Sequence, residues 1–582
     1  MIKKLAARVR QYKRQAILTP LFMVGEVAME ALIPLVMSWL IDRGVEAGNM
    51  GQIFLYGGVL ILTALISLLS GTMSGRMAAV SSAGFARNLR HDMYYNIQDF
   101  SFSNIDKFST SSIITRLTTD VTNVQNAFQM ILRMAVRAPL TLIFSIIMAF
   151  TINARISLVF VFTMPVLALG IATIMTRTHP IFKRVFKTYD KLNNVVQENL
   201  RGVRVVKSFV REDYEEKKFN TISESIYTDF VHAEKNLAFN GPLMMTCIFG
   251  CTLVISWLGA KAIIASGNNP ALGLTTGQLM SLITYVIQIL GSLMMVSMVF
   301  LMITMSRASA QRIVEVLDEK TDITSPENAR TEIADGSIDF DHVSFSYASR
   351  SERATLEDID LHIPSGAVVG ILGGTGSGKS TLVQLIPRLY DVSGGCVRVG
   401  GEDVRSYDLT ALRESVAMVL QKNELFSGTI KDNLRWGNEQ ATDEDIMEAC
   451  RLAQADPFIQ DFPDKYDTWI EQGGTNVSGG QKQRLCIARA LLKKPKILIL
   501  DDSTSAVDTR TDALIRAGFR SYIPDTTKLI IAQRVASVKD ADLIIVLDNG
   551  RVVDTGTHEE LLARCEIYRE VHDSQTKGGE DQ

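Results

Sequence analysis

Nine consecutive residues carry the clearest chemical signal in this sequence. In order they are Gly373-Gly374-Thr375-Gly376-Ser377-Gly378-Lys379-Ser380-Thr381. They match the phosphate-binding pattern G-x-x-x-x-G-K-[ST], in which glycines let the backbone wrap closely around anionic oxygens. Exposed N–H groups and the N-terminus of a following helix add positive potential. We therefore expect this P-loop to hold a nucleotide, with Lys379 on the β- and γ-phosphates and Ser380 on Mg²⁺.

The sequence around the P-loop fits a strand–loop–helix unit. The apolar run Ala367–Leu372 predicts a buried strand, and Thr381–Ile386 predicts the helix that follows the loop. The alternative is a glycine-rich turn that matches the pattern by chance. A strand before the loop and a helix after it argue against that alternative.

Two adjacent carboxylates follow a second apolar strand. Ile497–Leu500 is apolar throughout, which is typical of a strand buried on both faces of a parallel sheet. Asp501 and Asp502 come directly after it. At the tip of such a strand, Asp501 is expected to bind Mg²⁺ beside the P-loop.

Three further features lie around these two motifs. Val343–Tyr347 alternates like a strand, and Tyr347 at its end is a candidate to stack on adenine, although a surface tyrosine would fit equally well. Gln421 and the segment Ser478–Gln481 lie between the P-loop and Asp501.

The composition divides the 582 residues into two unlike halves. Hydrophobic residues make up 47% and charged residues 21%, because the N-terminal half is strongly apolar and the C-terminal half resembles a soluble domain. A chain of this length predicts at least two domains. The net charge of −3 argues against nucleic acid as a partner.

Six apolar segments in the first half are each long enough to cross a bilayer. They are 16–41, 53–80, 128–152, 156–178, 238–264 and 279–305. The loops between them alternate between short ones and long basic ones, so the positive-inside rule places the N-terminus and the C-terminal half in the cytoplasm of a cell or inner membrane. Residues 1–15 are basic and amphipathic, which indicates either a helix on the inner membrane surface or a plain basic cap.

The long inner loops are themselves helical in pattern. Residues 82–121 and 182–227 contain almost no proline or glycine, so the spans are expected to continue as helices into the cytoplasm. The turns near Ile105–Ser112 and Phe209–Tyr214 are then natural contact points for the C-terminal domain. Our hypothesis is that these turns transmit force between the two domains; solvated helical hairpins without such a role are the alternative.

Charged residues inside the spans are costly in lipid and therefore informative. Glu26 and Glu30 share one face of the first span, and Arg133 and Arg137 form a similar pair in the third. One interpretation is an anionic site for cationic substrates in a cavity. The other is internal pairing of glutamate with arginine.

The motif order identifies a family. Ser478–Gln481, just before a predicted helix at Arg484–Leu492, resembles the signature motif of ABC ATPases. The family order is matched by Tyr347, the P-loop, Gln421, the signature, Asp501 and then Ser505-Ala506-Val507-Asp508. Six spans in front of such a domain resemble the half-transporter of an ABC exporter. The expected fold is a six-helix membrane domain at 16–305 and a linker at 306–331, followed by an α/β P-loop nucleotide-binding domain at 332–582.

The resemblance also implies how ATP is bound. In this family two nucleotide-binding domains face each other, and each ATP lies between the P-loop of one and the signature of the other. Gln421 would sense Mg²⁺ and the γ-phosphate, and Asp508 would lie at the dimer interface. The residues that would contact ATP bound to the partner are Ser478, Gly479, Gly480 and Gln481.

Two departures from the family pattern suggest slow hydrolysis. The family usually has glutamate after the strand aspartate as a general base, and this chain has Asp502, whose shorter side chain is poorly placed for proton transfer. At the switch position, where histidine is expected, the chain has Gln533, which has no protonatable imidazole. The signature is intact, so the chain resembles the degenerate-site half of a bacterial heterodimeric multidrug exporter.

The expected function is ATP-driven export of hydrophobic drugs or lipids by this chain together with a homologous half-transporter. A homodimeric lipid or peptide exporter is one alternative. A membrane-bound regulatory ATPase that transports nothing is another. The six spans exclude a soluble ABC ATPase of the DNA-repair type.

Overall fold

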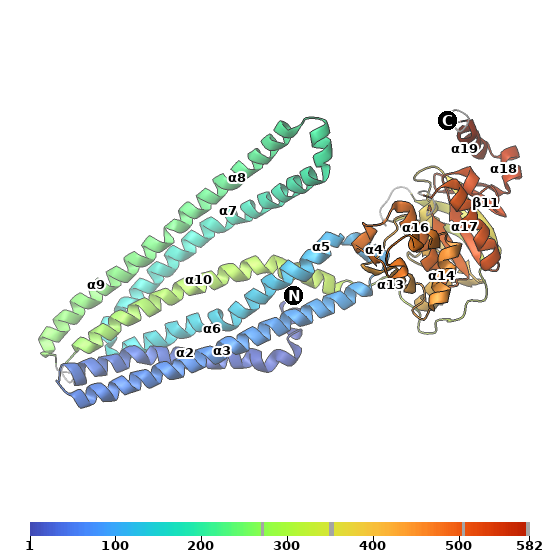
Figure 1. Cartoon of the computed structure of the whole chain (residues 1–582). Coiled ribbons are helices and arrows are strands. Elements are labelled where there is room, and N and C mark those ends of the chain that lie inside the picture. The colour runs from blue at the N-terminus through green and yellow to red at the C-terminus, as the bar shows by residue number, and fades with distance from the viewer. Residues whose placement is uncertain (269–272, 348–353, 503–506, 578–582) are drawn as a thin grey trace. The chain divides into compact units, whose positions relative to one another are not determined.

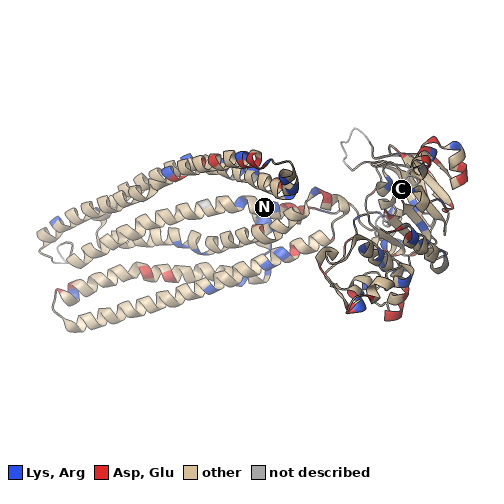
Figure 2. Cartoon of the chain, turned by 45° about the horizontal axis from the view of Figure 1, so that its top comes forward, with Lys and Arg blue, Asp and Glu red and all other residues tan. Residues whose placement is uncertain are grey.

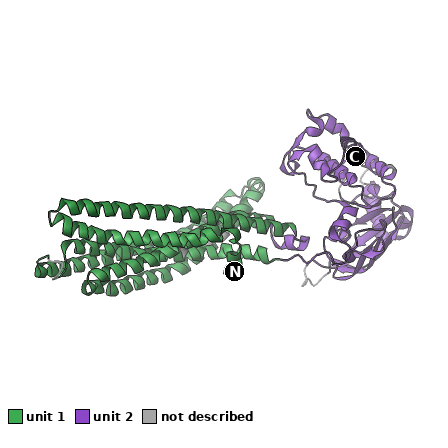
Figure 3. Ribbon diagram, turned by 90° about the horizontal axis from the view of Figure 1, so that it is seen from below, with its two compact units in different colours: residues 1–98, 110–319 green, residues 99–109, 320–582 purple. Residues whose placement is uncertain are grey.

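The computed structural model describes residues 1–268, 273–347, 354–502 and 507–577. These residues form two compact units, shown in different colours in Figure 3. The first unit comprises residues 1–98 and 110–319, and the second comprises residues 99–109 and 320–582. Ser505 and Ala506, which belong to the expected motif order, lie outside the described residues.

The first unit consists of long helices (Figure 1). Among the described residues, six helical stretches are long and apolar enough to cross a membrane, which confirms the six expected spans. Large apolar side chains on them are widely exposed, as a lipid-facing surface requires. The helices are α1 Ile2–Ala7, α2 Lys13–Leu40, α3 Met50–Gln98, α5 Thr110–Thr115, α6 Val121–Ile152, α7 Ala154–Ser208, α8 Glu212–Ala238, α9 Asn240–Ser266 and α10 Thr276–Asp318, with short 3₁₀ or π segments at Arg10–Tyr12, Ile41–Val45 and Arg116–Asp120.

The helical extensions expected from the inner loops are present. Helix α3 continues to Gln98, and α7 and α8 form a hairpin whose turn begins after Ser208. Figure 2 shows that the charged residues of these long helices gather mainly toward one end of the bundle. Helix α10 continues to Asp318, so the first part of the predicted linker at 306–331 is helical.

The second unit is built on two sheets. The larger has the strand order β12-β11-β3-β10-β9-β6, and β11, β3, β10, β9 and β6 run parallel. The smaller sheet is antiparallel, in the order β2-β1-β4-β5. The strands are β1 Ile338–Phe345, β2 Leu356–Ile363, β3 Val368–Gly373, β4 Gly394–Val399, β5 Glu402–Asp403, β6 Val416–Val419, β7 Gly428–Thr429, β8 Trp469–Ile470, β9 Ile497–Asp501, β10 Thr527–Ile531, β11 Leu543–Asp548 and β12 Arg551–Gly556.

Helices cover the sheets of this unit and complete its two hydrophobic cores. Strands β3, β9 and β10 are almost completely buried, as their continuous apolar sequences predict. The helices are α4 Phe102–Lys107, α11 Lys379–Gln384, α12 Leu409–Ser415, α13 Ile430–Arg435, α14 Asp443–Leu452, α15 Asp456–Gln460, α16 Gly479–Leu492, α17 Thr509–Tyr522, α18 His558–Arg564 and α19 Glu566–Lys577.

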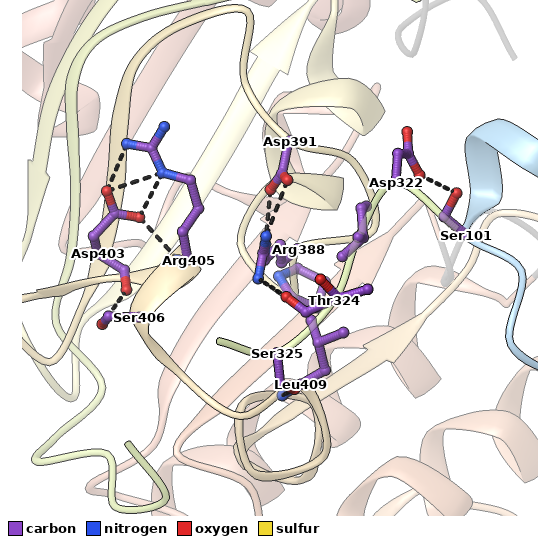
Figure 4. Close-up of polar contacts among 12 residues, drawn as sticks. Ser101, Asp322, Thr324, Ser325, Arg388, Asp391, Asp403, Arg405, Ser406 and Leu409 are labelled. Atoms are coloured by element: carbon purple, nitrogen blue, oxygen red, sulfur yellow. Dashed lines mark hydrogen bonds and ion pairs between the residues drawn. The ribbon is translucent and has the colours of Figure 1, made fainter. Parts of the chain in front are cut away.

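The short segment 99–109, which includes α4, belongs to the second unit although it lies between two long apolar helices in sequence. The Ser101 hydroxyl donates to Asp322 Oδ1 over 2.5 Å, as Figure 4 shows. In the same view Arg388 binds the Asp391 carboxylate and the carbonyl oxygen of Thr324. The segment between α10 and β1 is thus bound at Asp322 by Ser101 and at Thr324 by Arg388.

Candidate nucleotide-binding site and membrane ion cluster

The P-loop joins the carboxyl end of β3 to α11, as the strand–loop–helix pattern predicts. Gly378 has a φ of 94°, a conformation that side chains rarely adopt, and a Cβ on Gly373 would collide with the backbone of the neighbouring strand β11. The Lys379 ammonium donates to the carbonyl oxygens of Gly373 and Gly374 over 2.8 and 2.7 Å. Burial lowers the pKa of Lys379. The loop therefore holds a poorly hydrated cation where phosphate oxygens are expected.

A magnesium-binding corner lies beside this loop. The Ser380 hydroxyl donates to Asp501 Oδ1 over 3.0 Å, so the two residues expected to bind Mg²⁺ are in contact. Asp501 is buried at the end of β9, and burial raises its pKa, with the Asp502 charge acting in the same direction. Two adjacent carboxylates and a hydroxyl fit a hard cation that takes oxygen ligands. Strand β6 runs parallel to β9 and ends two residues before Gln421, which places Gln421 at the same edge of the sheet.

The two residues that depart from the family pattern contact each other. The Gln533 amide donates to Asp502 Oδ2 over 2.9 Å. They meet because β9 and β10 are parallel neighbours, and each residue follows the end of its strand. Burial raises the pKa of Asp502, and the hydrogen bond from Gln533 opposes that rise. Asp502 has a φ of 45°, in the left-handed region, so its backbone is also unusual.

Tyr347, the expected adenine-stacking residue, lies close to the P-loop helix. Its hydroxyl is 3.0 Å from Thr381 Oγ1 and donates to Gln384 Oε1 over 3.3 Å. Its ring packs edge-on against Tyr390, with ring centroids 5.2 Å apart. The structure thus brings Tyr347 to the P-loop, and half of its surface remains exposed.

Tyr390 is a site residue that the motif analysis missed. Its hydroxyl donates to Asp106 Oδ2 of α4 over 2.7 Å, and its ring meets that of Phe102 at 6.0 Å. Contacts therefore run from helix α4 of segment 99–109 through Tyr390 to Tyr347. No local spacing marks Tyr390, because its partners are distant in sequence. The sequence analysis expected the turn near Ile105–Ser112 to contact the C-terminal domain, and the bond between Asp106 and Tyr390 agrees with that expectation. Force transmission through this turn stays a hypothesis.

The signature residues begin α16. Ser478 caps the helix: its hydroxyl accepts from the Gln481 N–H, and the Gln481 side chain accepts from the Ser478 N–H over 2.9 Å. Ser478 and Gly479 are exposed, and Gly480 and Gln481 are partly so. Asp508 caps α17 by accepting from the Thr511 N–H over 2.9 Å, and that bond lowers its pKa. The signature loop and Asp508 are both accessible at the surface of this chain.

Arg137 of α6 pairs with both glutamates of α2, whereas the buried Nε of Arg133 has no hydrogen-bond partner among the described residues. The Arg137 guanidinium donates to Glu26 Oε1 over 2.5 Å and to both Glu30 oxygens over 2.8 Å. Gly71 of α3 faces the Glu26 carboxylate, where a Cβ would leave too little room. Glu30 and Arg137 also line a cavity of about 270 Å³ together with Ser145 and Gln288. The structure thus contains the internal pairing that the sequence left as one of two interpretations, with Arg137 as its centre.

Comparison with known proteins agrees with this geometry. The family model described as ABC transporter transmembrane region matches residues 16–293, and the one described as ABC transporter matches residues 356–505. The uncharacterized ABC transporter ATP-binding protein YfiB of Bacillus subtilis (strain 168) is 36% identical over 574 residues, which cover 99% of this chain and 98% of YfiB. The chain belongs to the ABC transporters.

Two further ABC proteins are similar to this chain over most of its length. A fatty acid ABC transporter ATP-binding/permease protein of Mycobacterium bovis is 32% identical and covers 83% of this chain and 75% of its own length. The structure of a bacterial Atm1-family ABC exporter with ATP bound superposes with a TM-score of 0.80 at 24% identity, over 97% of this chain and 98% of that one. This ABC transporter therefore has the exporter fold, with a transmembrane region and an ATP-binding domain in one chain.

Proposed function

We propose that this ABC transporter subunit exports hydrophobic drugs or lipids from the cytoplasm, driven by ATP and Mg²⁺. The exporter fold and the six membrane helices support transport over a purely regulatory role. The long basic inner loops support a cytoplasmic nucleotide-binding domain in the cell or inner membrane. Lipids are favoured as a substrate class by the name of the mycobacterial relative, a fatty acid transporter.

We further propose that the chain's own ATP site turns over slowly. The observation that carries this proposal is the 2.9 Å hydrogen bond from Gln533 to Asp502. A general base must reach the proton it abstracts within hydrogen-bond distance, and Asp502 is shorter than glutamate and already bound to a neutral amide. Gln533 cannot supply a protonatable group at the switch position. ATP held by Lys379 and Ser380 would therefore be retained as a clamp between two subunits.

The second subunit is proposed to be a homologous half-transporter with its own glutamate and histidine. The exposed signature residues Ser478 and Gly479 support a role in completing a site on another chain. Asp508 is accessible in the same way. The α7–α8 turn leaves Phe209 and Val210 exposed, and these apolar side chains offer a contact for a nucleotide-binding domain. Most hydrolysis would occur at the partner's site.

ATPase measurements on the full chain test this assignment. The chain alone in proteoliposomes should hydrolyse ATP slowly, and co-reconstitution with a homologous half that has glutamate after its strand aspartate should restore activity. Strong ATPase activity from the chain alone, abolished by Asp502→Asn, would contradict the slow-site assignment and favour a homodimer. Nucleotide-dependent dye uptake into inverted vesicles separates a transporter from a regulatory ATPase.

The membrane cavity beside Glu30 is the proposed place for substrate. Its wall combines the charged pair with apolar side chains such as Val27 and Ile287, which suits an amphipathic molecule. Glu26→Gln tests the cationic-substrate interpretation by removing charge while retaining size. Unchanged export of cationic and neutral compounds would leave the Arg137 pairing as the only role of the glutamates. A loss restricted to cationic compounds would support recognition.

A further inference from the structure

The last helix of the described chain, α19, reaches residues 533–535, which follow β10 and are called the switch segment below. Helix α19 packs on the core of the nucleotide-binding unit through the buried ring of Tyr568, with Ile567 and Val571 partly buried beside it. Near its end, the Gln575 amide donates to the carbonyl oxygen of Gln533 over 2.8 Å. The same side chain accepts from the Val535 N–H over 2.8 Å.

These two bonds hold both sides of one short backbone segment. An amide side chain has a donor and an acceptor, and Gln575 uses both to bridge Gln533 and Val535 much as a neighbouring strand would. Val535 is buried, so the segment is also anchored by its side chain. Arg534 is the one residue between the two bonded positions, and strand β10 ends at Ile531, two residues before Gln533.

The segment that Gln575 holds is the one that aims Gln533 at Asp502. The Gln533 side chain donates to Asp502 Oδ2 over 2.9 Å, and the Lys379 charge acts on the Asp502 carboxyl. A shift of the Gln533 backbone would therefore change the polar group that faces the phosphate end of the site. Positioning of about 1 Å matters at such a site, because hydrogen bonds weaken steeply when distance and angle change.

We propose that α19 is a strap for the switch segment, and that Gln575 is the positioning residue through which it acts. The strap fixes Gln533 and thereby slows the release of nucleotide from this chain's own P-loop. This inference rests on the proposed retention of ATP at that site, and it adds a part of the chain outside all the nucleotide motifs. Gln575 itself touches no substrate.

The test uses the full chain in lipid nanodiscs and a fluorescent non-hydrolysable ATP analogue with Mg²⁺. Gln575→Ala should increase deuterium uptake in peptides covering residues 533–538 and speed analogue release by about threefold to tenfold, the range expected for loss of hydrogen bonds. Gln575→Glu keeps an acceptor for the Val535 N–H but has no donor for Gln533, so it should give an intermediate release rate. Ser574→Ala, at the exposed neighbouring position, should change neither measurement.

A double-mutant cycle separates positioning from a general effect on the fold. If α19 acts through Gln533, then Gln533→Ala alone should speed release, and adding Gln575→Ala should have no further effect. Release that stays within about twofold of the unsubstituted chain in Gln575→Ala, or fully additive effects in the cycle, would overturn the proposal. Release of this analogue requires neither hydrolysis nor a partner, so the strap can fail while the slow-site proposal stands, and the reverse.

Discussion

The two ends of the ATP site differ in how much of the family's chemistry they keep. At the P-loop end, Lys379, Ser380 and Asp501 have the residue types and contacts that phosphate and Mg²⁺ binding require. At the other end, Asp502 and Gln533 replace a longer carboxylate and an imidazole, and they bind each other. Under the proposed slow turnover, nucleotide binding and nucleotide cleavage would be separable in one fold, because they would depend on different residues of the site.

Rebuilding the altered end should have the largest effect. Asp502→Glu combined with Gln533→His restores the usual general base and switch residue, so ATPase activity of the full chain should rise by about 10²- to 10⁴-fold, the usual contribution of general base catalysis. Steady-state phosphate release in proteoliposomes measures this change. Asp525→Glu adds the same methylene at an exposed position and is the matched control. Unchanged activity in the double variant would place the defect elsewhere.

Damage to the intact end should be nearly as large but should affect binding. Lys379→Ala removes the cation held at 2.7–2.8 Å from the loop carbonyls, and ATP affinity should fall on the order of 10- to 100-fold, as for loss of charged hydrogen bonds. Equilibrium binding of a fluorescent ATP analogue measures the affinity. If the Asp502/Gln533 double variant also changed ATP affinity, as Lys379→Ala is expected to do, binding and cleavage would not depend on different residues.

A smaller effect is expected at Tyr347. Tyr347→Ala removes the ring proposed to stack on adenine and should weaken ATP binding by roughly 5- to 100-fold, the range of base–aromatic stacking. Tyr347→Phe keeps the ring and loses only the hydroxyl contacts with Thr381 and Gln384. The phenylalanine variant should therefore bind ATP nearly normally. Comparison of ATP with a ribose triphosphate lacking a base would show whether the ring acts on adenine.

The smallest expected effect is a change in stability with pH, which arises from protonation of His558 near α19. Burial lowers the pKa of His558. The nearby charges of His572 and Lys539 lower it further, whereas those of Glu559 and Asp540 raise it. The unfolded chain takes up this proton near pH 6.5, whereas the folded unit resists it, so the free energy of unfolding should decrease as the pH falls below 6.5. Thermal unfolding of the full chain between pH 7.5 and 5.5 measures the slope. His558→Gln should make that slope shallower; an identical slope would contradict the assignment.

Much of this site follows from sequence because its motifs are local. A glycine loop between a strand and a helix, or a carboxylate after an apolar strand, is defined within a few residues. The contact between Asp502 and Gln533 required the structure, which makes β9 and β10 parallel neighbours and places each residue just beyond the end of its strand. The partners of Glu26 and Glu30 were narrowed to arginines of the third span, but only the structure singles out Arg137.

Other contacts could not be predicted because they depend on tertiary folding. Tyr390 meets Asp106 across 284 residues of sequence, and Gln575 meets Gln533 across 42. Neither pair has a spacing that a helix or a strand would impose. The exact end of α10 at Asp318 lies beyond its apolar stretch, and hydropathy alone does not fix such an end.

The placement of segment 99–109 in the nucleotide-binding unit has a consequence for synthesis of the chain. Ser101 must wait for Asp322, which is 221 residues further along, and Asp106 must wait for Tyr390. At ribosomal rates of about 5–20 residues per second, the interval for Tyr390 is roughly 15 to 60 s. Helix α4 therefore leaves the ribosome long before its binding surface exists. The nucleotide-binding unit can therefore complete its fold only when residues 99–109, made early, are joined by residues 320–582, made last.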